Sequence, residues 1–391
     1  MKVLIFAVSI LVISSTHNFA SEEDSLADME KILQQAVEEK RESAGLVGLG
    51  AVVIQDAKVI GLSVSGKRRI RHDSFLAPDD RWHIGSVTKS FTATMIARLV
   101  EKGILRWNTS IKEVFAEHDQ IHSSWHNVTL DQLLTHTSGA KPNFSLLLNF
   151  KNPDAGIQRM VARESAVKNV LKQAPQTTPG EKFEYSNVGY TIAGVMAEKK
   201  TEKSWEQLIS EQIFAPLGIQ SGGFGVPKGV EGELHQPWGH QSLFGFSLSS
   251  QDDNTPIIGP AGTIHLSLKD LALYGNEHLQ GLSGKSSVLQ KDSFQRLHHP
   301  KLDDYAYGWV VDSPNELDVG RVHWHNGSNT MWYALLVILP DINAVVAVTS
   351  NDGKTNVAEQ SAWEIIEGLA KPLEASHRSS INFGVEKSAG D

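Results

Sequence analysis

Apolar residues change their spacing several times along the chain, and these changes predict the order of the elements. From Ser25 to Glu42 they recur three or four positions apart, which is typical of an amphipathic helix. Two runs with strand character follow, Leu46 to Ile54 and Val59 to Val64, and the turn residues between them predict a β-hairpin. From Ser86 to about Ile219 the helical spacing dominates again.

The second half of the chain returns to strands. Gly, Ser, Gln and His are frequent from Ser221 to Pro260, which predicts a long loop. One helical segment follows Gly262, a closing helix is expected over Val357–Lys371, and a polar tail follows it. Between these helices we expect four strands: Gly308–Val311, Arg321–Trp324, Met331–Leu339 and Asn343–Thr349.

Strands at both ends of the chain around a helical middle predict an α/β (α+β) fold in one domain, residues 21–391. We expect a discontinuous α/β lobe of about residues 25–80 and 262–372, an inserted helical lobe of about 81–261, and a polar tail over 373–391.

Charge and composition narrow the classes of partner. The net charge of −9 argues against nucleic acid, and the densest basic run, Lys67 to Arg71, is too short to change this. Cysteine is absent, so the chain has no disulfide framework and no thiolate metal site.

The N-terminus has the pattern of a secretory signal peptide. Met1-Lys2 precedes the apolar run Val3 to Ile13, and Ala20 precedes an acidic stretch. We therefore expect a signal peptide over residues 1–20 and a secreted or periplasmic protein. No later stretch approaches the roughly 20 apolar residues that a membrane span needs.

Candidate chemistry begins at Ser86 and Lys89, which stand three residues apart in a helical pattern. Positions i and i+3 share one helix face, so the hydroxyl and the amine would lie within reach. Apolar neighbours would lower the pKa of the lysine amine and make it a base for the serine. The spacing Ser-x-x-Lys also occurs at Ser138, in a predicted turn, and at Ser165, in a charged run from Arg163 to Lys168 that indicates a solvated helix face.

Two further motifs follow in the chain. In Tyr185-Ser-Asn187, a phenol beside a cationic lysine can have a lowered pKa and relay protons, and the amide can orient a carbonyl. In His325-Asn-Gly327, the glycine allows a substrate backbone to approach a strand.

In this order, the three motifs resemble those of the serine β-lactamase and penicillin-binding-protein superfamily, especially class C β-lactamases, DD-peptidases and related esterases. The resemblance covers about residues 45–370 and implies an antiparallel sheet flanked by helices, with an inserted mainly helical lobe. Supporting blocks are Leu133–Gly139, Pro179-Gly180, Gly259-Pro-Ala-Gly262, Tyr307-Gly-Trp309 and Leu339-Pro-Asp341.

The resemblance also implies roles. Ser86 would be the nucleophile, Lys89 its base and Tyr185 the proton relay to the leaving group. Substrate would be bound by Asn187, His325 and Gly327, and the backbone N–H groups of Ser86 and Ser328 would form the oxyanion hole.

The resemblance implies a secreted hydrolase that acts through an acyl-enzyme on a D-Ala-D-Ala-type peptide, a β-lactam or an ester. A carboxylesterase of the same fold and a penicillin or peptidoglycan sensor without turnover remain open. We expect a peptide or small-molecule substrate and no cofactor; the sequence leaves the oligomeric state open.

His325 departs from the lysine that begins the third motif in most β-lactamases. With an unperturbed pKa of about 6.5 it would be partly protonated near neutrality and would then attract a substrate carboxylate. His136 is expected to bond backbone groups at a turn.

Other chemistries fit the sequence less well. An α/β-hydrolase would need Gly-x-Ser-x-Gly, which is absent. A zinc site could use His298-His299 or the pair His323 and His325, but the chain has no His-Glu-x-x-His. In a strand, the pair is expected to lie on one exposed side.

Overall fold

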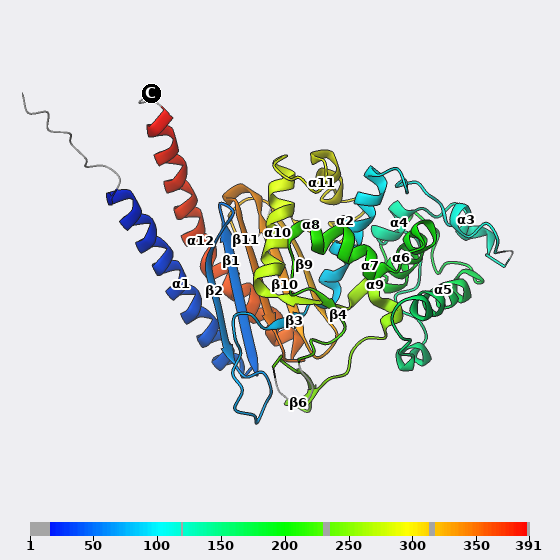
Figure 1. The fold of residues 1–391 in the computed structure, drawn as a ribbon, viewed down its shortest axis with the longest axis horizontal. Helices are drawn as coiled ribbons and strands as arrows, with labels where there is room; N and C mark the ends of the chain where they lie inside the picture. Colours follow the sequence, from blue (N-terminus) through cyan, green and yellow to red (C-terminus); the bar gives the residue numbers. More distant parts are fainter. Residues whose placement is uncertain (1–15, 119, 230–234, 313–316, 389–391) are drawn as a thin grey trace, which may run out of the picture.

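The computed structural model describes residues 16–118, 120–229, 235–312 and 317–388. Residues 1–15, most of the expected signal peptide, lie outside this range. Figure 1 shows a sheet with the long helices α1 (Thr16–Ala44) and α12 (Thr355–Ser388) on one side, and α10 (Leu268–Leu282) and the helical lobe on the other.

The sheet is antiparallel throughout, in the order β2-β1-β11-β10-β9-β8. The expected hairpin at the N-terminal end and the expected strands at the C-terminal end therefore form one sheet. Its strands are β1 (Gly48–Gln55), β2 (Lys58–Gly66), β8 (Val310–Asp312), β9 (Val322–Ser328), β10 (Tyr333–Leu339) and β11 (Ala344–Ser350).

Helices cover both faces of the sheet, so its central strands β1, β10 and β11 are buried along their whole length. Side chains still alternate between two cores. Ala51 and Val53 pack on the α1 and α12 side, whereas Val52 and Ile54 belong to the larger core shared with the helical lobe.

The inserted lobe is mainly helical, as expected. Its helices are α2 (Thr88–Glu101), α3 (Ile111–Val114), α4 (Leu130–Leu134), α5 (Ile157–Leu171), α6 (Asn187–Thr201), α7 (Trp205–Ile209), α8 (Ala215–Leu217) and α9 (Gly259–Gly262). Helix α11 (Lys291–Leu297) packs beside α10.

Small sheets connect the lobes. Strands β3 (Arg81–His83), β7 (Ile264–Ser267) and β4 (Gly223–Phe224) form a three-stranded sheet. The prediction of a long loop over Ser221–Pro260 is partly wrong. Within this stretch, β5 (Gly239–Leu243) and β6 (Phe246–Ser250) pair in a hairpin. Its apolar tip faces solvent, so no buried alternation marked these strands in the sequence.

Two element ends also differ from expectation. Helix α12 continues past Lys371 and through Pro372 to Ser388, so most of the expected tail is helical. Strand β9 does not stop at Trp324 but includes His325 and Gly327. Among the described residues, no helix is both long and apolar enough to cross a membrane.

The charged run of α5 is only partly the solvated face that the sequence indicated. Ser165 is exposed, and Lys168 makes a partly exposed ion pair with Glu164. Arg163 is instead fully buried and pairs with Glu198 and Glu206. The apolar neighbours that bury Arg163 come from distant segments, so the run itself does not reveal them.

Candidate active site

Ser86 lies in a 3₁₀ turn, Gly85–Val87, that leads directly into α2. The residues around it are buried, whereas Ser86 itself keeps partial exposure. Lys89 Nζ lies 3.0 Å from Ser86 Oγ, so the structure brings the two groups together as the spacing predicts. A weak nucleophile and a candidate base therefore share one hydrogen bond.

Lys89 is fully buried, and its amine has two further partners. Nζ lies 2.7 Å from Asn187 Oδ1 and 2.8 Å from the carbonyl oxygen of Ala261 in α9. Burial lowers the pKa of Lys89 well below its usual value. A neutral amine has two N–H donors and one lone pair. The two donors match the two oxygens, and the lone pair is left to accept the Ser86 hydroxyl proton.

Tyr185 lies on the open side of this pair, with 36% of its surface exposed. Its ring centre is 4.7 Å from Lys89 Nζ, and its phenol hydrogen-bonds with Ser86. The expected lowering of its pKa is wrong. Desolvation raises the pKa of Tyr185 and outweighs the effect of its contact with the Ser86 hydroxyl, so the phenol stays protonated near neutral pH.

Asn187 begins α6 and connects Lys89 to a residue that the sequence did not single out. Its Oδ1 accepts from Lys89, and its Nδ2 donates to Asn143 Oδ1 at 2.7 Å. The amide therefore orients the base in addition to its expected contact with substrate. Asn143 lies one residue after Pro142, whose carbonyl accepts from the Asn187 backbone N–H. No motif in the sequence marked Asn143.

Two glycines let β9 lie directly against the turn that carries Ser86. A Cβ on Gly327 would be 2.3 Å from the Ser86 nitrogen, and one on Gly85 would be 2.3 Å from the Ser328 nitrogen. Gly327 therefore lets β9 approach the turn that carries Ser86. The sequence had instead indicated that this glycine lets a substrate backbone approach the strand. This packing brings the backbone of Ser328 close to that of Ser86, the two residues whose N–H groups were expected to form the oxyanion hole.

His325 lies buried in β9 on the side that faces the site. Its Nδ1 lies 2.5 Å from the Asn326 carbonyl, so that nitrogen carries the proton, and Nε2 accepts from the Tyr305 hydroxyl at 3.1 Å. Burial, helped by the nearby Lys89 amine, lowers the pKa of His325 to about 3 despite the bond to Asn326. The expectation that His325 is partly protonated near neutral pH is therefore wrong, because its ring is neutral there.

Because the His325 ring is neutral, kcat/KM should depend on pH in the same way for charged and for uncharged substrates. The lowered pKa means that His325 takes up a proton only near pH 3, so no carboxylate-specific limb should appear between about pH 5 and pH 8. We expect kcat/KM for a D-Ala-D-Ala peptide and for a neutral ester to change in parallel over that range. A limb near pH 6.5 for the peptide alone would contradict the assignment.

Aromatic rings form the wall behind the catalytic groups. His136 adopts φ +57°, and its Nδ1 accepts from the Ser186 backbone N–H at 3.0 Å, which confirms its expected role at a turn. Its ring lies 4.4 Å from Tyr185 and 4.7 Å from Tyr305. Tyr305 was missed, although it stands two residues before the Tyr307-Gly-Trp309 block.

The remaining histidine candidates are structural. His323 and His325 share one side of β9, as expected, but both are buried, because that side faces the core. His298 bonds His323 at 2.8 Å and His278 at 2.9 Å, so each of its ring nitrogens has a partner. In the described part of the chain, no group of three or more His, Cys, Asp or Glu residues could hold a metal ion.

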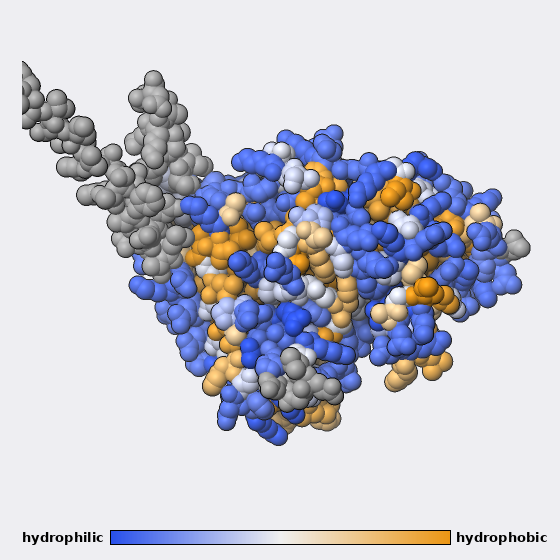
Figure 2. Space-filling model, viewed as in Figure 1, coloured by the Kyte–Doolittle hydropathy of each residue, from blue (hydrophilic) through white to orange (hydrophobic). Residues whose placement is uncertain are grey.

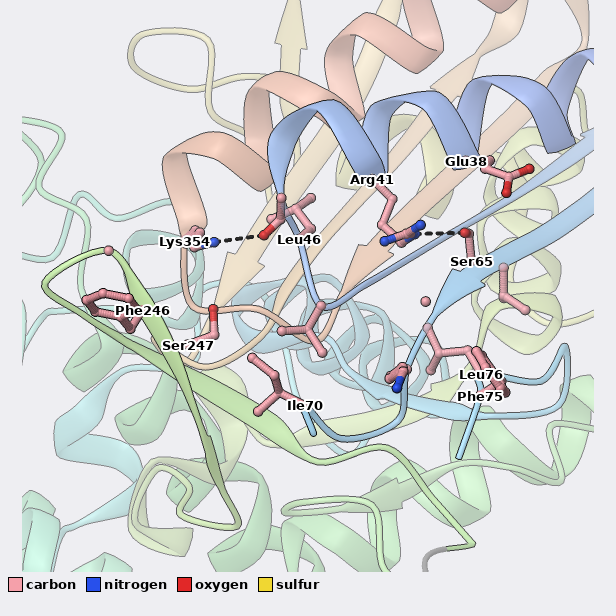
Figure 3. Close-up of a pocket in the computed structure, with 16 residues that line it drawn as sticks. Glu38, Arg41, Leu46, Ser65, Ile70, Phe75, Leu76, Phe246, Ser247 and Lys354 are labelled. Carbon is pink, nitrogen blue, oxygen red and sulfur yellow. Dashed lines mark hydrogen bonds between the residues drawn. The ribbon is translucent and has the colours of Figure 1, made fainter. Parts of the chain in front are cut away.

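A pocket of about 730 Å³ lies elsewhere, between α1, β2 and the β5–β6 hairpin (Figure 3). Its cationic groups are already engaged, since Arg41 donates to Ser65 Oγ and Lys354 to the Gly45 carbonyl. None of the predicted site residues lines it. Despite its size, we therefore place the chemistry at Ser86.

The family model Beta-lactamase matches residues 33–371, so the chain belongs to this family. Its fold is that of the serine β-lactamase and penicillin-binding-protein superfamily, and it is similar to two solved structures. One is the D-amino acid amidase from Ochrobactrum anthropi SV3, with 19% identity, a TM-score of 0.72, and coverage of 89% of this chain and 99% of the amidase. The other is the octameric penicillin-binding protein homologue from Pyrococcus abyssi, with 24% identity, a TM-score of 0.69, and coverage of 86% and 75%.

Two curated relatives are similar in sequence. Protein flp of Staphylococcus aureus (strain MW2) is 21% identical over 338 residues, which are 83% of this chain and 63% of flp. Unguisins hydrolase ungD' of Aspergillus campestris is 22% identical over 293 residues, 71% of this chain and 53% of that hydrolase. The chain thus spans less than two thirds of either relative.

Proposed function

We propose that the protein is a serine hydrolase that forms an acyl-enzyme on Ser86. The observation that carries the proposal is the hydrogen bonding of Lys89 Nζ. Asn187 Oδ1 and the Ala261 carbonyl oxygen accept two of its N–H bonds, and burial lowers its pKa; in the neutral amine the lone pair is therefore left for the Ser86 hydroxyl.

In the first half-reaction, Ser86 Oγ bonds to the substrate carbonyl carbon while Lys89 Nζ takes the hydroxyl proton. The negative oxygen is bound by the backbone N–H groups of Ser86 and Ser328. The C–O or C–N bond then breaks, and the leaving alcohol or amine receives a proton through Tyr185. Because the phenol is protonated at neutral pH, it can donate its own proton and be reprotonated from Lys89. Water repeats the sequence on the acyl-enzyme and releases the acid.

Lys89→Arg should reduce kcat/KM by about 10²–10⁴-fold, the range of general-base catalysis. Arginine stays charged and cannot accept the proton. In the wild type, the lowered pKa of Lys89 predicts that activity falls as acid protonates the amine and reaches its plateau well below the usual lysine pKa. Steady-state kinetics against pH measures both effects.

Lys168→Arg is the matched control, because that lysine belongs to the exposed Ser165 motif and should leave the rate unchanged. A fully active Lys89→Arg variant would remove the base role from Lys89.

The substrate class is tested with nitrocefin, a D-Ala-D-Ala peptide and a p-nitrophenyl ester. One similar protein is named an amidase and another a hydrolase, which supports a substrate with an amide or ester carbonyl as the group that Ser86 attacks. Intact-protein mass spectrometry after penicillin exposure separates turnover from sensing. An adduct that persists while no substrate turns over would show a sensor.

We also propose that the protein is secreted after removal of residues 1–20. N-terminal sequencing of the mature protein would test this.

A further inference from the structure

Five apolar side chains face solvent, three within residues 146–150 and two at the start of α5, and we call this set the apolar rim. Their exposed fractions are 79% for Leu146, 78% for Leu147, 86% for Phe150, 78% for Ile157 and 59% for Val161. Single exposed apolar residues are common, but a group of large ones within sixteen positions usually marks a binding surface.

The part of the rim within residues 146–150 is held at both ends by hydrogen bonds to segments that lead to the candidate active site. On one side, Asn143 bonds Asn187, the partner of Lys89. On the other side, the carbonyl of Lys151 accepts from Thr255 Oγ1 at 2.5 Å. Two residues before Thr255, Asp253 accepts from the Asn329 amide, next to Ser328. The segment 144–150 therefore runs between the two walls that contribute the base and the oxyanion hole.

The figures agree with this placement. In Figure 1 the chain between α4 and α5 lies on the helical lobe, away from the six-stranded sheet. In Figure 2 apolar atoms gather on the protruding part below the position of α5, across a hollow from the part that carries β6. The apolar rim thus borders an open approach to the molecule.

The fold itself does not use these side chains. Helix α5 buries Arg163, Ala166 and Val167 and turns Ile157 and Val161 outward. The nearby cation Arg159 is engaged with Glu206 and with the Pro153 carbonyl. The exposed side chains of Lys151 and Asp154 stand close to the rim in the sequence, but the rim residues themselves offer only apolar contact, which suits a hydrocarbon chain better than an ionic group.

We propose that the apolar rim binds the hydrocarbon chain of the substrate, so that the substrate class is an ester or amide with an extended apolar acyl chain. This inference rests on the proposed function, because it assumes that Ser86 attacks the carbonyl next to that chain. Each methylene that leaves water for the rim strengthens binding, so long acyl chains gain over short ones.

The test compares kcat/KM for p-nitrophenyl octanoate and p-nitrophenyl acetate, both kept below the concentration at which micelles form. We expect the wild type to prefer octanoate. The triple variant Leu146→Gln/Leu147→Gln/Phe150→Gln should lower the octanoate-to-acetate ratio by about tenfold or more and leave acetate hydrolysis unchanged.

The β5–β6 hairpin provides a control of identical composition. Its residues Leu243, Phe244 and Leu248 are 49%, 92% and 46% exposed, and changing all three to Gln should not alter the ratio. Equal ratios for the wild type and the rim variant would overturn the inference. If that variant instead loses binding to phospholipid vesicles or loses self-association, the rim belongs to a membrane or to a second copy. Acetate hydrolysis that survives Ser86→Ala would contradict the proposed function itself, which keeps the two failures apart.

Discussion

Ser86→Ala should lower kcat/KM for every substrate by about 10⁴-fold or more while the protein stays folded. Lys89 Nζ contacts one hydroxyl, that of Ser86, and two oxygens of Asn187 and Ala261 that cannot act as nucleophiles. Alanine would leave the base without a group to activate. The affected hydroxyl is small and only partly buried, so its loss should change stability little.

Two decoys and one direct readout make this prediction specific. Ser165→Ala removes an exposed hydroxyl on α5 and should change nothing. Ser138→Ala removes a buried hydroxyl that accepts from the Ala140 N–H, so it tests whether the loss of any buried serine is enough. Mass spectrometry should show a penicillin adduct in both decoys and none in Ser86→Ala. Activity of Ser86→Ala within tenfold of the wild type would show that Ser86 is not the nucleophile.

Features that depend on neighbours in the chain could be predicted from the sequence. The pairing of Ser86 with Lys89 needs only a helical spacing of three residues. The strands β10 and β11 are apolar runs bounded by turn residues, and both were expected close to their actual bounds. The order of the three motifs indicated the family, because each motif is short and local.

Features that depend on burial could not be predicted. The pKa of Tyr185 is raised and that of His325 lowered because segments distant in the sequence pack around both groups and reduce their hydration, even though Tyr185 keeps an exposed edge. The sequence shows which groups titrate but not how much water reaches them. Tyr305, which bonds His325, could have been noticed, since it precedes Tyr307 by two positions and alternate residues of an extended segment share one side.

Burial also connects Arg163 with the active site. Its Nη2 donates to the Pro256 carbonyl at 2.8 Å, and its Nε donates to the Ile257 carbonyl at 3.0 Å. These residues lead directly into α9, where Ala261 accepts from Lys89. The ion pairs of Arg163 therefore stabilise the segment that orients the base.

Arg163→Met should destabilise the protein by about 3–5 kcal/mol, the usual result of removing one partner from a buried ion pair. It would leave the Glu198 carboxylate, with a side chain only 3% exposed, without its cation, and Glu206, 12% exposed, with Arg159 as its remaining cationic partner. Urea unfolding measures the loss as a lower midpoint at unchanged slope. Activity under native conditions should also fall, because the Ala261 carbonyl loses its support.

Lys168→Met on the same helix gives the matched control. Its pair with Glu164 is partly exposed on both sides, so the expected change is only about 0.3–0.5 kcal/mol. A second variant, Arg163→Met/Glu198→Leu/Glu206→Leu, replaces all three charges by apolar groups and should recover much of the lost stability. If the triple variant is no more stable than Arg163→Met, unpaired carboxylates are not the cause of the loss, and the lost hydrogen bonds to Pro256 and Ile257 are. In that case, the support of α9 is the main contribution of Arg163.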